Sequence, residues 1–220
     1  MKLFLSGGGG NASQLEMKFI NSIESGKKIL YIPAAMDEKK HPYPECLEWI
    51  IKFYGSLGFE NIVMLEDLSQ VDKINLKEIG GMHISGGNTF KLLDKIRKSG
   101  FNKVIQYFID NDLPIAGGSA GAIIFGNTIK TAIDIDTNDV GIQDFRSFDK
   151  LRGYDFWPHY DPIFDNQIFE YILKYNIEKI VAIYEDAGIY VDDNSILVVE
   201  KNAYVFTKDG KMKKNPGEFL

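Results

Sequence analysis

Short apolar segments alternate with amphipathic segments through the first half of the chain, and this pattern limits the possible folds more than any other feature of the sequence. The apolar segments lie at residues 3–5, 28–35, 62–65, 81–84 and 113–116. Each has the length of a buried strand, and the segments between them place apolar residues at helical spacing, as in residues 43–57. This alternation is typical of βαβ units that build a parallel sheet.

The amino-acid composition changes after Thr131, where glycine, aspartate and aromatic residues become frequent. Here the pattern predicts strands at 130–133, 156–159 and 180–184, a helix at 163–175, and further strands at 188–191, 195–200 and 203–207. We find no linker and no internal repeat. The sequence therefore predicts one α/β domain over residues 1–220, with a mostly parallel sheet flanked by helices and short antiparallel strands at its C-terminal end.

Composition excludes several classes of protein. The 220 residues carry 25 basic and 31 acidic side chains, a net charge of −6, which argues against a partner such as nucleic acid or an anionic membrane. Cys46 is the only cysteine and there are three histidines, so we expect no disulfide framework, no metal site and no cofactor. No apolar run is long enough for a bilayer span or a signal peptide, which favours a cytoplasmic protein.

The strongest chemical motif is Gly117-Gly118-Ser119-Ala120-Gly121, which matches the G-x-S-x-G nucleophile elbow. An apolar strand precedes it, and small residues able to begin a helix follow it. A serine on such a sharp turn projects its hydroxyl away from the sheet, and the small neighbours prevent clashes. Free N–H groups at the start of the helix would lie beside a developing oxyanion. The sequence therefore favours Ser119 as a nucleophile over an incidental residue of a glycine turn.

Serine needs a base to act as a nucleophile, and there are three candidate histidines. His41 lies in a loop that enters a helix, which suggests a surface position. His83 lies inside an apolar strand, which suggests a core position. His159 follows a predicted strand and precedes a loop, the location where α/β folds place catalytic groups. It is the preferred base.

The third residue, which would orient the imidazole, should be a carboxylate. Asp134 fits the chain order serine, acid, histidine, and Glu185 fits the order serine, histidine, acid. The sequence leaves both open. Glu185 is slightly favoured because its strand reads as buried and central, whereas the polar neighbours of Asp134 suggest a more exposed position.

Two further glycine-rich turns follow predicted strands. Gly86-Gly87 precedes a helix that Asn88 or Thr89 would cap, and an N–H of this turn could be a second oxyanion donor. Residues 7–12 contain a G-x-G-x-x-A pattern that nucleotide sites tolerate, but the acidic residue expected after the second strand is missing.

Four motifs together resemble the peptidase E (aspartyl dipeptidase) family of serine peptidases. They are ISGGNTFKLL at 84–93, GSAGA at 118–122, TIKT at 128–131 and PHY at 158–160. They occur in the order and spacing of that family, and the strand plan follows it over nearly the whole chain. The resemblance implies a fold like that of class I glutamine amidotransferases, with serine in place of the cysteine nucleophile.

The same resemblance implies roles for individual residues. Ser119 would be the nucleophile and His159 the base, and both Asp134 and Glu185 match positions proposed for the charge partner. Gly87 and the Ala120 amide match the oxyanion positions. Asn88 lies where substrate would be held.

One departure from the family concerns specificity. Members that cleave after an N-terminal aspartate carry an arginine in the helix after the catalytic histidine, whereas residues 161–175 contain only Lys174. We therefore expect a serine-type exopeptidase or dipeptidase, a monomer or homodimer, that hydrolyses short peptides through an acyl-enzyme without a strong aspartyl preference. The alternatives are an esterase or cyanophycinase-like hydrolase with the same triad, or a non-catalytic module that binds an anion or nucleotide.

Overall fold

The predicted alternation of strands and helices is present in the computed structural model, which describes residues 1–9 and 13–220. The first five strands are β1 (Lys2–Ser6), β2 (Lys28–Ile32), β3 (Ile62–Met64), β4 (Ile79–Ile84) and β5 (Pro114–Gly118). The helices among them are α1 (Ser13–Asn21), α2 (Tyr43–Ser56), α3 (Thr89–Ser99), α4 (Asn102–Asp110) and α5 (Ala120–Ile123), with 3₁₀ turns η1 (Leu68–Lys73) and η2 (Leu76–Glu78) before β4.

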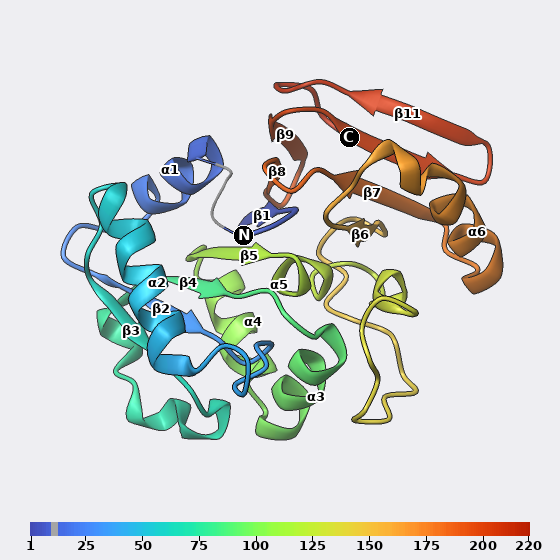
Figure 1. Ribbon diagram of the computed structural model, residues 1–220. Helices are drawn as coiled ribbons and strands as arrows, with labels where there is room; N and C mark the ends of the chain where they lie inside the picture. The colour runs from blue at the N-terminus through green and yellow to red at the C-terminus, as the bar shows by residue number, and fades with distance from the viewer. Residues whose placement is uncertain (10–12) are drawn as a thin grey trace.

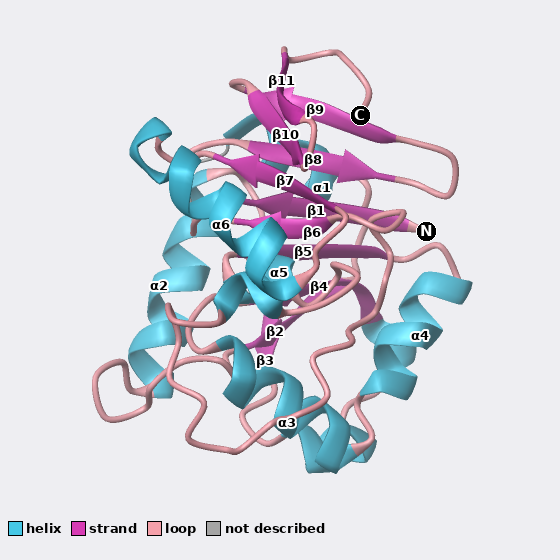
Figure 2. Cartoon of the chain, turned by 90° about the vertical axis from the view of Figure 1, so that its right-hand side faces the viewer, coloured by secondary structure: helices cyan, strands magenta, loops and turns pink. Residues whose placement is uncertain are grey.

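The main sheet has the strand order β3-β2-β4-β5-β1-β8-β9, where β8 is Gly188–Val191 and β9 is Ile196–Glu200. The strands from β3 to β1 are parallel to one another, and β8 and β9 add to β1 as antiparallel neighbours. Figure 2 shows these strands stepping from β9 at the top to β3 at the bottom. The predicted fold class, a mostly parallel sheet flanked by helices, is confirmed.

Alternate residues of the central strands enter two separate cores, because successive side chains of a strand point to opposite faces. Leu3, Leu5 and Ile32 belong to the core beneath α3, α4 and α5. Phe4 and Tyr31 belong to the core beneath α1 and α2. The near-continuous apolar composition of these strands follows from burial on both faces, which is typical of parallel sheets.

A second sheet has the order β11-β10-β7-β6, with β6 at Asp155–Trp157, β7 at Lys179–Ile183, β10 at Ala203–Thr207 and β11 at Gly210–Lys214. One face packs on the main core through Phe156, Val181 and Ile183. The other face packs on α6 (Asp165–Tyr175), which follows the short turn η4 (Pro162–Phe164). Figure 1 shows this sheet and α6 at the right of the molecule. Of its strands, only β6 and β7 are parallel neighbours.

The prediction of a strand at 130–133 is wrong. Lys130–Ala132 form a 3₁₀ turn, η3. The carboxylate of Asp155 accepts hydrogen bonds from the N–H and hydroxyl of Thr128, and the hydroxyl of Thr131 donates to the Phe156 carbonyl. These bonds attach the turn to the start of β6 and replace the ladder that a strand would need.

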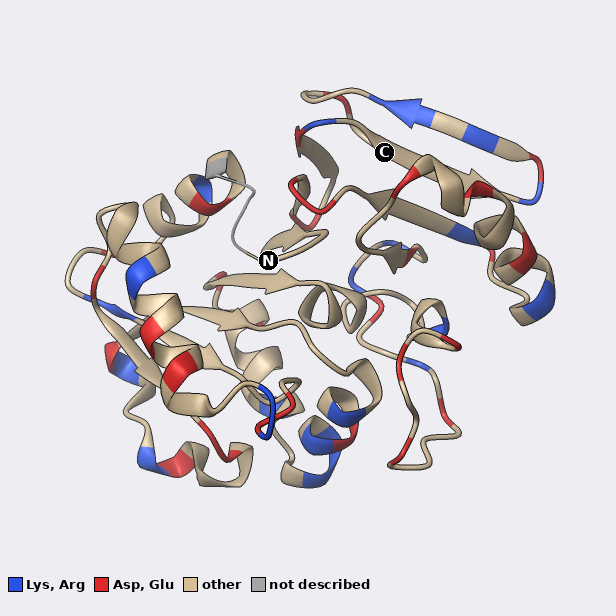
Figure 3. Cartoon of the chain, viewed as in Figure 1, with Lys and Arg blue, Asp and Glu red and all other residues tan. Residues whose placement is uncertain are grey.

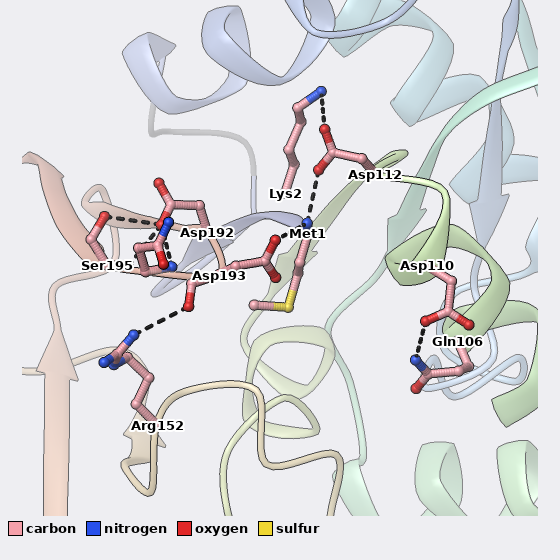
Figure 4. A network of polar contacts seen from close by, with 10 residues as sticks. Met1, Lys2, Gln106, Asp110, Asp112, Arg152, Asp192, Asp193 and Ser195 are labelled. Carbon is pink, nitrogen blue, oxygen red and sulfur yellow. Dashed lines mark hydrogen bonds and ion pairs between the residues drawn. The ribbon is translucent and has the colours of Figure 1, made fainter.

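The end of β1 that lies away from the serine is fixed by ion pairs, which Figure 4 shows. The amino group of Met1 lies 2.8 Å from Asp112 and 3.0 Å from Asp193, and Lys2 lies 2.8 Å from Asp112. Asp112 precedes β5 and Asp193 follows β8, so the contacts tie β1 to both of its neighbours in the sheet. The hydrogen bond from Lys2, followed by that from the amino group, lowers the pKa of Asp112.

Three polar side chains meet in the core between α1, α2 and β4. The hydroxyl of Tyr54 lies 2.8 Å from Glu16 Oε2 and 2.7 Å from Nδ1 of His83. Burial raises the pKa of Glu16 from its usual value near 4.5 to about 7, against the opposing effect of the Tyr54 hydrogen bond. Burial also lowers the pKa of His83 to about 4. Glu16 is therefore neutral in the folded protein between about pH 4.5 and 7, where the carboxyl group of the unfolded chain would be charged. His83 is neutral in the folded protein between about pH 4 and 6.5, where the imidazole of the unfolded chain would be charged.

We expect Glu16→Gln to remove a pH-dependent loss of stability. Between about pH 4.5 and 7 the folded chain holds the Glu16 proton and the unfolded chain does not, so the wild-type protein loses stability as pH rises. The free energy of unfolding of Glu16→Gln should gain on that of the wild type by roughly 2–3 kcal/mol over this range. Urea titrations at a series of pH values measure the difference. The contribution of His83 is common to both proteins, and a constant difference across the range would contradict the prediction.

Candidate active site

Ser119 lies on the sharp turn between β5 and α5, with φ 50° and ψ −114°. This conformation is strained for a residue with a side chain. The Ser119 N–H donates to the carbonyl of Ser6, 3.2 Å away, which fixes the turn against the end of β1. Gly121 is required beneath it, since a Cβ there would lie 2.2 Å from the Ile84 carbonyl. The sequence folds into an elbow because its small residues allow β4, β5 and α5 to approach this closely.

His159 comes from the second sheet, two residues after β6 ends. It also has a positive φ, 50°, and its N–H donates to the carbonyl of Gly7 at 3.1 Å. This backbone contact joins the turn after β6 to the turn after β1. Nε2 of His159 lies 2.8 Å from Oγ of Ser119, so a neutral imidazole can accept the serine proton.

Glu185 lies two residues after β7, the parallel neighbour of β6. Because parallel strands end at the same edge of a sheet, the segments that carry Glu185 and His159 lie side by side. Nδ1 of His159 and Oε2 of Glu185 are hydrogen-bonded. Gly8 makes room for this pair, since a Cβ there would lie 2.3 Å from Oε1 of Glu185. The glycines after β1 thus permit close packing beside the carboxylate.

Asp134 is held elsewhere. Its Oδ2 accepts a hydrogen bond from the Tyr175 hydroxyl at 2.7 Å and one from Lys174 at 3.1 Å. These contacts, with Tyr175 the stronger, lower the pKa of Asp134. The structure therefore brings Ser119, His159 and Glu185 into one hydrogen-bonded chain, whereas Asp134, in the loop after η3, is bonded to two residues of α6.

Exposure does not separate the two carboxylates. The side chain of Glu185 is 54% exposed and that of Asp134 is 57% exposed. The expectation that Glu185 would be the more shielded group is wrong, because β7 is central in the small sheet and its end opens to solvent. The hydrogen bond to the imidazole is what distinguishes Glu185.

The two turns matched to the oxyanion site lie beside the serine. Ala120 is the first residue of α5, and the first N–H groups of a helix have no intrahelical acceptor. Gly86 packs on Ser119, since a Cβ there would lie 3.1 Å from the serine Cβ. Gly87 has φ 132°, and a Cβ there would lie 2.3 Å from the Ala35 carbonyl. The turn at 86–87 therefore depends on glycine for its approach to Ser119.

Asn88 uses its side chain to fix local structure. Its Oδ1 accepts the N–H of Lys91 at 2.8 Å and caps α3. Its Nδ2 donates to the carbonyl of Thr137 at 2.8 Å, which ties the loop after η3 to the start of α3. Asn88 also lines a polar surface cavity with Lys40 and Lys91.

Two cavities meet at Ser119 and His159. The first, here the α2 cavity, has a volume of about 470 Å³ and is lined by Tyr31, Met36, His41, Glu45, Cys46 and Trp49. The second, here the α6 cavity, has a volume of about 430 Å³ and is lined by Thr89, Ile123, Asp136, Trp157, Phe164 and Gln167. Ser119 thus lies between two recesses, each of a size that holds small ligands or side chains.

The sequence did not predict that most of the residues lining these two cavities belong to the site. His41 was assigned to the surface, and although it is exposed it lines the α2 cavity. Trp49 lies within the helical pattern of residues 43–57 and is exposed at the same cavity. Asp136 and Gln167 carried no motif. Only the positions just after strand ends, such as His159, had a signal in the sequence.

The three histidines take different positions in the fold. His83 is buried in β4, whereas His41 and His159 lie at the cavities. Among the described residues, no group of three or more His, Cys, Asp or Glu side chains is placed to hold a metal ion. Over the same residues no helix is both long and apolar enough to cross a bilayer.

Comparison with known proteins gives matches over most of the chain. Peptidase E of Shewanella sp. strain W3-18-1 is 32% identical over 143 residues, a match that covers 60% of this chain and only 58% of that relative. Peptidase E of Shewanella denitrificans is 28% identical over 224 residues, which cover 94% of this chain and 90% of the relative.

A solved structure and a family model extend these matches. A Listeria monocytogenes EGD-e protein provisionally named peptidase E superposes with a TM-score of 0.71 at 24% identity, covering 90% of this chain and 96% of that one. At this identity the likeness shows the fold alone. The model of peptidase family S51 matches residues 3–199, nearly the whole chain. The chain therefore belongs to peptidase family S51.

Proposed function

We propose that this protein is a serine exopeptidase that hydrolyses short peptides through an acyl-enzyme on Ser119. The observation that carries the proposal is the chain of contacts from Ser119 through His159 to Glu185, on a strained turn between two cavities. A serine is activated when a base lies within hydrogen-bond distance and a third group orients that base. Membership of family S51 and the peptidase E relatives support the same reaction.

Acylation begins when Oγ of Ser119 attacks the carbonyl carbon of the scissile bond. Its proton passes to Nε2 of His159, and Glu185 stabilises the imidazolium through Nδ1. The carbonyl oxygen becomes an oxyanion that the N–H groups of Gly87 and Ala120 would bind. His159 then gives its proton to the leaving amine, the C–N bond breaks, and the acyl group remains on the serine.

Deacylation repeats these steps with water as the nucleophile. His159 takes a proton from water, the hydroxide adds to the acyl carbon, and the proton returns to Oγ as the ester bond breaks. No external oxidant, reductant or metal enters the balance. The side chains of His159 and Glu185 are about half exposed, so water reaches this site directly.

The charges around the α6 cavity bear on specificity. None of its described lining residues is a lysine or arginine, and Asp136 adds a negative charge. Lys174, the cation that the sequence offered, is paired with Asp134 instead. A substrate carboxylate in this cavity would therefore lose water without gaining an opposite charge, which is unfavourable. Gln167 is the residue of α6 that reaches the cavity, and it is neutral.

A dipeptide panel with a fluorophosphonate probe tests both the reaction and its specificity. The probe should label Ser119, because it reacts with activated serines and not with a binding module. We expect Ala-Phe to be hydrolysed with a kcat/KM at least about 10-fold above that of Asp-Phe. Gln167→Arg supplies a guanidinium group that can donate two hydrogen bonds to one carboxylate. This variant should therefore prefer Asp-Phe over Ala-Phe.

The controls separate the alternatives. Esters of the same acyl groups, with an alcohol in place of phenylalanine as the leaving group, reveal whether the protein is an esterase that does not cleave amides. Absence of both labelling and hydrolysis would contradict the serine mechanism. Cleavage of Asp-Phe in clear preference to Ala-Phe by the wild type would leave the reaction intact and contradict the specificity alone.

A further inference from the structure

Helix α2 presents an acidic and an aromatic side chain to the α2 cavity. Glu45 and Trp49 are four residues apart, so they lie on the same face of the helix in successive turns. Both are exposed, and both line the cavity that Ser119 and His159 also line. A substrate that reacts at the serine can therefore contact both side chains, although neither takes part in the hydrogen-bonded chain of the triad.

The carboxylate of Glu45 is the source of charge in this cavity. Among the described residues that line the cavity, it is the only carboxylate, and none is a lysine or an arginine. No ion pair or hydrogen bond to its side chain occurs among the described residues, His41 included. Burial, followed by the charge of Glu45, raises the pKa of the Cys46 thiol in the cavity wall. The potential in the α2 cavity therefore favours a cationic group.

Trp49 is held in a fixed orientation one turn further along α2. Its indole stacks on the ring of Phe53, with centroids 5.5 Å apart and planes at 3°. A Cβ on Gly9 would lie 3.9 Å from Cη2 of the indole, so Trp49 also approaches the glycine turn after β1. The side chain is nevertheless 44% exposed. Of the aromatic rings, an indole binds cations most strongly, and the flat guanidinium group of arginine can stack on it.

The charges of α2 also have an explanation that involves no ligand. Figure 3 shows acidic positions in the first half of the helix, which are Glu45 and Glu48, and a basic position further along, Lys52. An acidic residue in the first turn stabilises a helix through the macrodipole, and this accounts for Glu45 alone. It does not account for an exposed indole on the same face at the same cavity. Glu48 and Lys52 do not line the cavity.

We propose that the α2 cavity receives the leaving residue of the peptide, and that Glu45 and Trp49 select a basic side chain on it, arginine or lysine. The inference rests on the proposed peptidase function and deepens it, because it names the class of leaving residue. In that function the side chain of the first residue enters the α6 cavity, which leaves the α2 cavity for the second residue. His159 protonates the amine of the second residue, so the side chain of this residue begins beside the histidine. Its cationic end pairs with Glu45 and lies against the indole of Trp49.

The test compares Ala-Arg with Ala-citrulline, whose side chain has the length and shape of arginine but no charge. The wild type should prefer Ala-Arg by about 10-fold in kcat/KM, the size expected for one exposed ion pair together with one cation–π contact. In Glu45→Gln, which keeps the size of the side chain, this ratio should fall below about 3, mainly through a higher KM for Ala-Arg. Trp49→Leu should also lower the ratio, because leucine keeps an apolar surface and loses the cation–π contact. A ratio between two substrates of one enzyme does not depend on how much of a variant is folded.

Glu48→Gln is the matched control, because it removes the same charge from the same helix outside the cavity. It should keep the wild-type ratio. A ratio unchanged in Glu45→Gln, or lowered equally in Glu48→Gln, overturns the proposal. The reversed pair, Arg-Ala and citrulline-Ala, tests the assignment of the cavity. If Glu45→Gln changes the ratio of this pair instead, the α2 cavity holds the first residue and the proposal is wrong.

The wild-type results separate this inference from the proposed function. If the wild type cleaves Ala-Arg and Ala-citrulline equally, the peptidase function stands and the selection of a basic leaving residue is wrong. If it cleaves neither and the fluorophosphonate does not label Ser119, the proposed function fails and the inference fails with it.

Discussion

Ser119→Ala should lower kcat for dipeptide hydrolysis by about 10⁴-fold or more, because the acyl-enzyme can no longer form. The residual rate would come from binding and from the oxyanion donors, which the substitution leaves in place. The fold should persist, since the serine hydroxyl contacts His159 at the half-exposed site and contributes little to packing. Steady-state kinetics on Ala-Phe measure the effect, and the fluorophosphonate should no longer label the protein.

Ser119→Gly is the matched control for the strained turn. Glycine adopts φ 50° and ψ −114° without the steric cost that serine or alanine bears there. We expect Ser119→Gly to be as inactive as Ser119→Ala but at least as stable in urea unfolding, since relief of strain offsets the entropy of glycine. Near-normal turnover by either variant would rule out Ser119 as the nucleophile. Wild-type activity together with a lower free energy of unfolding in both variants would point to a structural role for Ser119.

The strand and helix pattern of the main sheet could be predicted because it depends on local periodicity. β1, β2, β4 and β5 lie where short apolar runs occur, and their neighbours are fixed by burial on both faces. The segment at 130–133 could not be predicted in this way. Its conformation is decided by Asp155, more than 20 residues later, whose carboxylate binds Thr128. A contact over that distance leaves no local pattern.

Only the part of the site that depends on local sequence could be predicted. Ser119 and His159 each follow a strand, and their local sequence reports their positions. The partner of the imidazole depends on β6 and β7 being parallel neighbours in a second sheet, which no local pattern specifies. The predicted antiparallel strands at the C-terminal end are present, but the sequence did not indicate their division between two sheets, since β8 and β9 join the main sheet while β10 and β11 join the other. Cavity residues such as Asp136 and Gln167 meet only through this arrangement.

Glu185→Gln should lower kcat by on the order of 10³-fold with little change in KM. The glutamine amide can donate to Nδ1 of His159 and so favour the tautomer that carries its proton on Nε2, which cannot accept the proton of Ser119. The substitution also removes the negative charge of Glu185, which stabilises the imidazolium in the transition state. Because the side chain of Glu185 is 54% exposed, water can replace part of its effect, and the loss should be smaller than that of Ser119→Ala.

Asp134→Asn is the comparison that decides between the two carboxylates. Asp134 binds Tyr175 and Lys174 on α6, so its amide should change kcat by less than about 10-fold. The two variants remove one negative charge each from side chains of nearly equal exposure, so a general charge effect would lower both rates alike. Only a direct bond to the imidazole makes Glu185→Gln the slower enzyme. If Asp134→Asn is inactive while Glu185→Gln keeps most of its activity, the loop after η3 must move to reach His159 in the reacting enzyme, and the order Ser119, Asp134, His159 describes the triad.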